Sequence, residues 1–420
     1  MITVSMIAAA FAFSSAARDI TEKSTDDCMF RLAGRSVLSE YLIPLKNDYG
    51  IFAFRGNEEE ICEKMKFYLE RSAGGKAAEK SILADTKEYR LTNPDAFEKE
   101  ILAAARFSLA EDVLDAGGTL IRKKEKSGRK PRNDVRVNVA EEGEEPGGPG
   151  REISQTGRKI KNKVIIKGLP SAGITSGGPD ISALVSQGLP SVEEIFKTQS
   201  DKFLVNKYIM QNFKNRKNIE IPTNTYFQNE AEYILYGKLS DDENASAFLS
   251  DFVIMRTALN LAHIYSDPKK VRELVAMAEL MTPGPGAVAT QAVLAGTWAL
   301  AEAENDKMLI LEDEKVALFK TRSNWALGLD GAVNGTAGTG ISGAVKPQSR
   351  GGNDYCGYLE IFLFLEDRTA KLLRMMDLIQ INMKLNYDGD FLLKEYNTGF
   401  RLSASAGGDI YVYDQRYEKL

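Results

Sequence analysis

Residues 2–41 read ITVSMIAAAFAFSSAARDITEKSTDDCMFRLAGRSVLSEY, and this stretch decides how the chain is organised. Its first part, residues 2–17, is apolar, carries no charge before Arg18, and is interrupted by neither Gly nor Pro. After Arg18 the apolar residues recur at roughly three- and four-residue steps, which is the period of an amphipathic helix. The sequence therefore predicts one long helix that is apolar at its start and two-faced afterwards.

The apolar run is expected to act as a membrane anchor. Its larger apolar side chains are Ile2, Val4, Met6, Ile7, Phe11 and Phe13. At about sixteen residues the run is shorter than the roughly twenty that span a bilayer core, and it lacks the basic segment of a signal peptide. Three interpretations stay open: a membrane helix that begins before Met1, which we favour, a tilted or interfacial anchor, and a buried helix of a cytoplasmic domain.

Composition limits the classes of function. The chain has 420 residues, enough for two or three domains, and a net charge of −5 that gives no reason to expect a nucleic-acid partner. Its three cysteines, Cys28, Cys62 and Cys356, have neither metal-ligand spacing nor the pattern of a disulfide framework. We expect free thiols; the alternative is a disulfide between Cys28 and Cys62 across a helical hairpin. The chain has a single histidine, His263, which argues against most histidine-based catalytic mechanisms. No catalytic residue, cofactor or metal site is predicted.

The pattern along the chain predicts an α+β fold that is predominantly α-helical. It divides into an anchor and spine helix at 1–42, a helical segment at 43–121, a low-complexity mobile insertion at 122–190, a helical core domain at 191–397 and a C-terminal β-hairpin at 398–420. The insertion alternates blocks of basic and acidic residues with Gly and Pro, a composition that buries too little apolar surface to offset the entropy of ordering. The hairpin forms a small antiparallel sheet around Gly407-Gly408.

Local signals predict further elements in the second half. Ser240-Asp-Asp-Glu243 has the pattern of a capping box, residues 315–320 (KVALFK) alternate like a strand, and residues 327–352 form a Gly-rich loop. Residues 355–386 are helical with a break near Glu366-Asp367. Five residues on apolar helix stripes are expected to share one cluster: Phe252, Leu259, Trp298, Leu372 and Met376.

Several polar residues could suggest chemistry, but a structural role explains each better. His263 lies near the end of its helix, where it would interact with the helix dipole. Glu230 and Glu232 are two residues apart, so on a helix they point to different faces; an inward Glu232 would pair with a basic residue such as Lys207. The Gly-rich stretches 172–179 and 335–343 lack the Gly-Lys-Ser/Thr of a phosphate loop.

A set of short stretches, taken in order, carries a resemblance to a known family. They are Ile2-Thr3-Val4 with Ala16-Ala17-Arg18, residues 37–41 (VLSEY), 49–54 (YGIFAF), 201–213 (DKFLVNKYIMQNF), 230–238 (EAEYILYGK), 298–303 (WALAEA), Lys320 with Trp325, and 374–382 (RMMDLIQIN). Together they resemble a bacterial family of unknown function associated with tight-adherence (Tad, or Flp-type) pilus loci, whose members look like enlarged TadE/TadG-like minor pseudopilins. The resemblance covers roughly two-thirds of the chain, outside the insertion.

The resemblance implies a non-enzymatic, membrane-anchored, pseudopilin-like protein on the outer face of the cytoplasmic membrane that assists assembly of a Tad-type surface pilus. Its implied partners are membrane lipid, pilus or pseudopilin components, and a second copy of the chain. Two alternatives from other classes stay open: a cell-envelope hydrolase, and a module that binds wall polymer through the basic tract at 122–167. For a hydrolase, the sequence offers no nucleophile, no set of histidines and no set of metal ligands. For a wall-polymer module, it offers only a charged linker.

Overall fold

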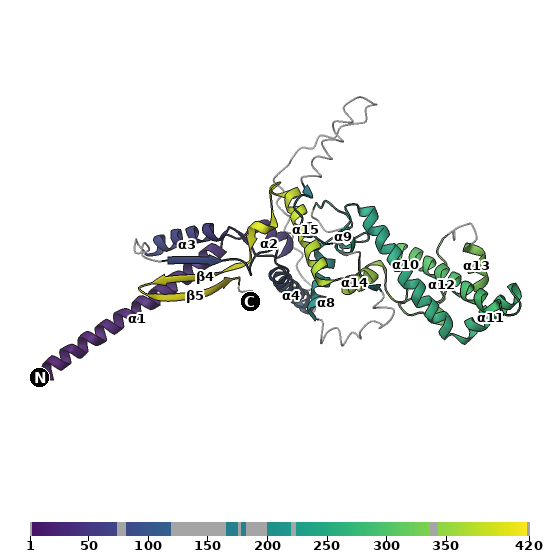
Figure 1. The fold of residues 1–420 in the computed structure, drawn as a ribbon, viewed down its shortest axis with the longest axis horizontal. Coiled ribbons are helices and arrows are strands. Elements are labelled where there is room, and N and C mark those ends of the chain that lie inside the picture. Colours follow the sequence, from purple (N-terminus) through teal and green to yellow (C-terminus); the bar gives the residue numbers. More distant parts are fainter. Residues whose placement is uncertain are drawn as a thin grey trace, which may run out of the picture. The chain divides into compact units, whose positions relative to one another are not determined.

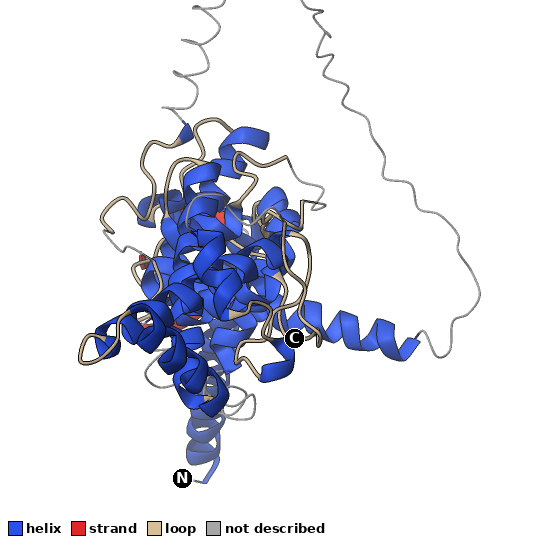
Figure 2. Ribbon diagram, turned by 90° about the vertical axis from the view of Figure 1, so that its right-hand side faces the viewer, coloured by secondary structure: helices blue, strands red, loops and turns tan. Residues whose placement is uncertain are grey.

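The computed structural model describes residues 2–73, 81–118, 165–174, 178–181, 200–219, 224–336 and 343–417. The chain divides into two compact units: the first comprises Met1–Ala172 and Ile379–Leu420, and the second comprises Gly173–Leu378. The boundary falls within helix α15 (Arg368–Asn386). Helices predominate in the described chain (Figure 2), and a small antiparallel sheet contains the C-terminal hairpin. The predicted α+β, mainly helical fold class is thus confirmed.

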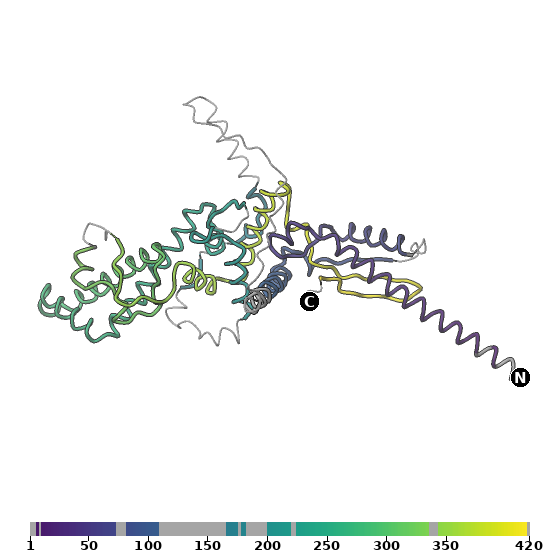
Figure 3. Tube along the Cα trace, turned by 180° about the vertical axis from the view of Figure 1, so that it is seen from behind, coloured from purple at the N-terminus to yellow at the C-terminus, as the bar shows by residue number. Residues whose placement is uncertain are grey.

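The first unit begins with α1 (Ile2–Leu38), a single helix without interruption. Its start extends beyond the strands of the unit, as seen from both sides in Figure 1 and Figure 3. Its last turns bury Phe30, Ala33, Val37 and Leu38. The long helix predicted from residues 2–41 therefore forms, and it ends at Leu38.

The C-terminal hairpin belongs to a three-stranded antiparallel sheet of order β2-β4-β5. Strands β4 (Gly399–Ala406) and β5 (Asp409–Arg416) are joined by Gly407-Gly408, whose φ angles of 56° and 86° suit a tight two-residue hairpin turn that only glycine adopts easily. The third strand, β2 (Ser81–Asp85), pairs along β4 from Ser81 opposite Ser405 to Asp85 opposite Arg401. The hairpin was predicted, whereas β2 was not.

One face of this sheet forms the core of the first unit together with α1 and α3 (Glu58–Ala73). Buried side chains from five elements meet there: Phe30, Ala33, Val37, Leu38, Phe54, Ile61, Met65, Leu69, Ile82, Phe400, Leu402, Ala404 and Ala406. On β4 every second residue from Phe400 to Ala406 is buried, which is the period-2 alternation of a half-buried strand. Hydrophobic burial therefore fixes which face of the sheet α1 covers.

The remaining elements of the first unit are short or connect these parts. They are α2 (Ile43–Tyr49), β1 (Phe54–Arg55), α4 (Pro94–Gly118), the 3₁₀ turn η3 (Leu393–Glu395) and β3 (Tyr396–Asn397). Strand β1 pairs antiparallel with β3, with Phe54 opposite Asn397.

The second unit is helical. It contains α8 (Ser200–Asn212), α9 (Glu230–Tyr236), α10 (Asp241–Ser266), α11 (Pro268–Met281), α12 (Ala287–Leu311), η2 (Arg322–Asn324), α13 (Leu329–Thr336), α14 (Tyr355–Leu365) and the first turns of α15. Helix α12 packs against α10, α11 and α13. The predicted break in the 355–386 helix is confirmed, because α14 ends at Leu365 and α15 begins at Arg368.

Two local predictions in this unit were wrong. Residues 315–320 do not form a strand; Val316 makes only an isolated bridge to Asn353, and the rest of the segment has no strand neighbour to pair with. Ser240 occupies the N-cap position of α10, but its side chain accepts no capping hydrogen bond. The Asp241 carboxylate instead accepts hydrogen bonds from the backbone N–H groups of Gln228 and Asn229.

Two predictions about larger regions also need correction. The Gly-rich segment 327–352 is not all loop, because α13 occupies Leu329–Thr336. The single apolar cluster does not form: Trp298 packs with α11, α13 and its own helix in a cluster that contains neither Phe252 nor Met376, although both are buried. Leu372 is buried as well but does not belong to the Trp298 cluster, and Leu259 is only partly buried. Most of the predicted insertion at 122–190 lies outside the described residues.

Candidate functional site

The start of α1 presents apolar side chains to solvent. Met6, Ile7, Phe11 and Phe13 are 70%, 58%, 73% and 78% exposed. The side chains of Ile2 and Val4, the other two predicted anchor residues, lie outside the described part of the chain. Across the residues that the structure does describe, no helix combines the length and the apolar character needed to cross a membrane.

The second half of α1 is held on strand β5 by a row of contacts. Phe30 packs against Tyr411 with ring centroids 5.4 Å apart, and a Cβ on Gly34 would lie only 2.6 Å from the Gln415 side chain. The Tyr417 hydroxyl donates a hydrogen bond of 2.7 Å to the Leu38 carbonyl. Helix and strand therefore approach closely at position 34, and this half of the helix is a packed element of the unit.

Charged groups add to the contacts between the second half of α1 and β5. The Tyr413 hydroxyl donates a hydrogen bond to the Asp27 carboxylate, which lowers the pKa of Asp27, while burial and this carboxylate raise the pKa of Tyr413. The Arg31 guanidinium lies 4.8 Å from the centre of the Tyr413 ring and donates a 3.0 Å hydrogen bond to Asp27. Nearer the hairpin turn, Lys23 and Asp409 form an exposed ion pair at 3.0 Å.

A groove of about 550 Å³ opens beside the contacts between α1 and β5. It is lined by Arg31, Arg35, Leu38 and Ser39 at the end of α1, by Tyr41 and Phe52, and by the six consecutive residues 412–417 of β5 and its end. Arginine and aromatic side chains thus share one concave surface. Sequence reasoning missed this groove because its walls come from opposite ends of the chain.

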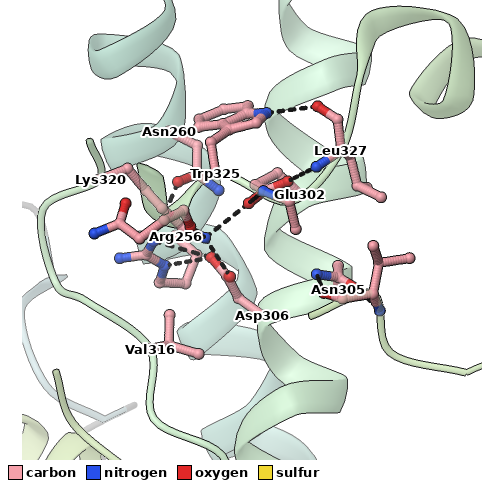
Figure 4. A network of polar contacts seen from close by, with 12 residues as sticks. Arg256, Asn260, Glu302, Asn305, Asp306, Val316, Lys320, Trp325 and Leu327 are labelled. Carbon is pink, nitrogen blue, oxygen red and sulfur yellow. Dashed lines mark hydrogen bonds and ion pairs between the residues drawn. The ribbon is translucent and has the colours of Figure 1, made fainter. Parts of the chain in front are cut away.

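A network of buried charges lies between α10 and α12 in the second unit (Figure 4). Arg256 pairs with Asp306 at 2.9 Å, and neither side chain is exposed. Lys320 lies 2.7 Å from both Glu302 and Asp306. Arg256 also donates to the Asn260 side chain and to the Leu318 carbonyl.

The network ties the segment after α12 to the helices. The two carboxylate oxygens of Glu302 accept hydrogen bonds of 2.9 Å from the backbone N–H groups of Ala326 and Leu327. Each charge in the network therefore has a partner, which is the arrangement of a structural lock. A sequence signal existed: Arg256 and Asn260 on one helix, and Glu302 and Asp306 on another, are four residues apart and so share a face.

Both tryptophans of the chain surround one lysine next to this network. The Lys270 ammonium lies 4.0 Å from the centre of the Trp298 ring and 3.6 Å from that of Trp325, and the residue is only 7% exposed. Burial lowers the pKa of Lys270 to about 8. The two indole faces attract the ammonium and offset part of the cost of burying it.

His263 lies in the last turn of α10, as predicted, and its interaction with the helix dipole stays a prediction. Its ring packs on Trp325 with centroids 5.4 Å apart, and its buried Nε2 has no hydrogen-bond partner within the described chain. Burial, followed by the Lys270 charge, lowers the pKa of His263. The imidazole is therefore favoured in its neutral form, as a packing partner of the tryptophan.

Glu230 and Glu232 are both buried and both hold the segment before α9. Glu230 accepts a hydrogen bond of 2.9 Å from the Lys214 backbone, and Glu232 accepts from the Arg216 backbone and from the Tyr355 hydroxyl. Burial raises the pKa of Glu232. The suggested Glu232–Lys207 pair does not form, because Lys207 lies 3.0 Å from Glu360 instead.

The other sequence candidates give no site. Cys28, Cys62 and Cys356 are free thiols. In the described ranges no three His, Cys, Asp or Glu side chains gather as metal ligands. The Gly-rich stretches 172–179 and 335–343 fall partly outside those ranges.

Comparison with known proteins places the chain in a family without assigning an activity. No curated protein and no solved structure matches it. One family model, described as a family of unknown function (DUF5702), matches residues 153–408, which is more than half of the chain. That description names no substrate, partner or pilus. The matched region contains the whole helical second unit and strand β4, and on this ground the chain belongs to the DUF5702 family of unknown function.

Proposed function

We propose that this protein is a non-enzymatic assembly protein, held at the outer face of the cytoplasmic membrane by the start of α1, and that it assists assembly of a Tad-type surface pilus. The observation that carries the proposal is the division of α1 into two halves. Met6, Ile7, Phe11 and Phe13 are exposed, whereas Phe30 is completely buried on the same helix. Such a helix suits a protein that offers an apolar stem and keeps its folded body attached.

The exposed side chains favour lipid as the environment of this stem. At about 100° per residue, positions 6, 7, 11 and 13 spread over about half of the helix circumference. Exposing several large apolar side chains together is unfavourable in water, at about 25 cal/mol for each Å² of apolar surface. Charge first appears at Arg18 and Asp19, where the stem would leave the apolar phase.

The role in pilus assembly is supported by the resemblance to TadE/TadG-like pseudopilins. It is also supported by the packing of the later turns of α1 on the β4–β5 sheet, since a subunit passed to a filament needs its stem joined rigidly to its body. The paired charges around Arg256 and Asp306 favour a structural role for this buried polar cluster of the second unit.

Membrane association tests the first part of the proposal. The full chain would be floated with vesicles of phosphatidylethanolamine and phosphatidylglycerol, and compared with the double variant Phe11→Asp, Phe13→Asp. The variant should lose most vesicle binding, while Phe107→Asp, which changes a phenylalanine on α4 that is 64% exposed, should bind as the native protein does. Equal flotation of the native protein and the double variant would refute the anchor.

Deletion of the gene tests the second part. The deletion strain should carry fewer surface pili, and the native gene should restore them while the gene with both Asp substitutions should not. Normal piliation in the deletion strain would refute the assembly role even if vesicle binding held.

A further inference from the structure

Strand β5 lies at the edge of its sheet. In the order β2-β4-β5 it has a neighbour on one side only among the described residues. Its sequence, DIYVYDQR, is rich in β-branched and aromatic residues, and it contains neither the Pro nor the Lys that commonly blocks an edge. Edge strands of this kind can pair with an added chain.

The register shows which backbone groups are free for such pairing. A two-residue turn makes Ala406 and Asp409 the closing hydrogen-bonded pair, so the backbones of residues 411, 413 and 415 point toward β4. In agreement, a Cβ on Gly399 would lie 2.4 Å from the Gln415 carbonyl oxygen. The N–H and C=O groups of Val412, Asp414 and Arg416 therefore point away from β4. Within the described chain they meet no other hydrogen-bonding partner.

The groove runs along this edge. Residues 412–417 all line it, although alternate residues of a strand point to opposite faces of the sheet. A hollow lined by both sets must follow the side of the strand itself. The opposite wall is α1, where Arg31, Arg35 and Leu38 follow one another at four- and three-residue spacing on one helix face.

The charges along the groove are mainly positive. Arg31, Arg35 and Arg416 line it, and Asp414, the single acidic side chain in its lining, is paired with Arg401 at 3.0 Å. Arg31 is partly neutralised by Asp27. Arg35 is exposed and makes no ion pair with any described residue. Carboxylates in a bound segment would complement these guanidinium groups, which suit paired hydrogen bonds to carboxylates.

We propose that the groove binds an extended acidic segment of a partner protein, which pairs with β5 as a fourth strand and places carboxylates against Arg31, Arg35 and Arg416. The outward backbone groups of Val412, Asp414 and Arg416 provide the hydrogen bonds, and the arginines select the charge. This inference does not depend on the attachment of α1 to lipid.

A designed peptide tests the proposal directly. The probe is a fluorescein-labelled peptide of about eight residues that alternates Val or Thr with Glu, and binding to the full chain is followed by fluorescence anisotropy. One control peptide replaces each Glu by Lys, and a second carries N-methyl groups on alternate backbone nitrogens, which removes the donors a strand needs. The acidic peptide should bind, and each control should bind about tenfold more weakly or worse. Failure of the acidic peptide to bind, or equal binding of either control, would overturn the proposal.

Two variants locate the site. Val412→Pro removes an outward N–H, and an edge strand tolerates proline where the N–H faces solvent; Arg35→Glu reverses one charge on the other wall. Each should weaken binding about tenfold or more, while the matched Ile410→Pro, outside the groove lining, should have little effect. If Val412→Pro alters the circular dichroism spectrum, Arg35→Glu decides the question alone.

Two further outcomes separate this proposal from its competitors. The double variant Phe11→Asp, Phe13→Asp should bind the peptide as the native protein does, and a loss of binding in it would overturn the location at β5. If sedimentation shows a dimer that Val412→Pro abolishes, and the peptide does not compete with it, the occupant is a second copy and the acidic partner is refuted.

Discussion

The guanidinium of Arg256 lies 2.9 Å from the carboxylate of Asp306, and neither side chain reaches solvent. Asp306 also accepts a hydrogen bond from Lys320, so one carboxylate faces two cations (Figure 4). Removing charges from water costs several kcal/mol for each ion, and only close pairing offsets that cost. The position of the segment that carries Lys320 therefore depends on the carboxylates of α12.

Replacing Asp306 by Asn should strongly destabilise the second unit. The substitution removes the carboxylate that pairs with Arg256 and leaves Lys320 with a single carboxylate partner, Glu302. Breaking a buried ion pair costs roughly 3–5 kcal/mol. Urea unfolding followed by tryptophan fluorescence measures this, since both tryptophans lie in the same unit. The control is Glu314→Gln, which removes a more exposed pair with Lys346 and should hardly move the midpoint. Equal midpoints for the two variants would contradict the lock.

Lys270 should make stability depend on pH in the alkaline range. Burial lowers its pKa from 10.5 to about 8, so between these values the unfolded chain holds a proton that the folded chain has released. Stability relative to Lys270→Met should therefore rise from pH 8 to about pH 10, by roughly 3 kcal/mol at most. Urea unfolding of both proteins at several pH values measures the difference, with Lys269→Met as the control on the exposed side of the same turn. A difference that stays constant or falls with pH would rule out the lowered pKa.

Gly352→Ala should destabilise the bridge between Val316 and Asn353. Gly352 has a φ of 115°, and a Cβ there would lie 2.2 Å from the Val316 carbonyl oxygen, so both backbone strain and a clash oppose alanine. The expected loss is roughly 1–3 kcal/mol. The neighbouring Gly351→Ala is the matched control, because a Cβ at that position would meet nothing within 4 Å. Thermal unfolding of the two variants gives the comparison, and similar melting temperatures would show that the backbone here adapts.

Phe30→Ala and Phe11→Ala should differ sharply although they lie on one helix. Phe30 is completely buried against Tyr411, and its truncation should cost roughly 3–5 kcal/mol. Phe11 is 73% exposed, and its truncation should leave the stability of the first unit almost unchanged. Hydrogen exchange of the β4 and β5 amides measures the loss. Faster exchange in Phe11→Ala, or unchanged exchange in Phe30→Ala, would mean that the two halves of α1 have been assigned the wrong roles.

Local pattern explains which parts of the fold were predictable. The helix from Ile2 was predictable because apolar residues at helical spacing continue along it without Gly or Pro up to Ala33. The break after Leu365 was predictable because Glu366 and Asp367 interrupt an apolar run. The hairpin was visible because Gly407 and Gly408 separate two alternating runs. Ser240 shows the limit of the same reasoning, because its side chain makes no capping hydrogen bond although it occupies the N-cap position of α10.

The sequence by itself determined the helical class of this protein, the apolar start of α1 and the terminal hairpin, because these features depend on residues that are close in the chain. Only the tertiary structure decided that β2 pairs with β4, that α1 and β5 enclose a groove, and that Arg256, Asp306 and Lys320 form a network. Strand β2 and its partner are more than three hundred residues apart, and the charges of the network were compatible with exposed positions as well. Strand partners and buried charges depend on packing against elements that are distant in the chain. A short stretch of sequence does not show which distant element will pack against it.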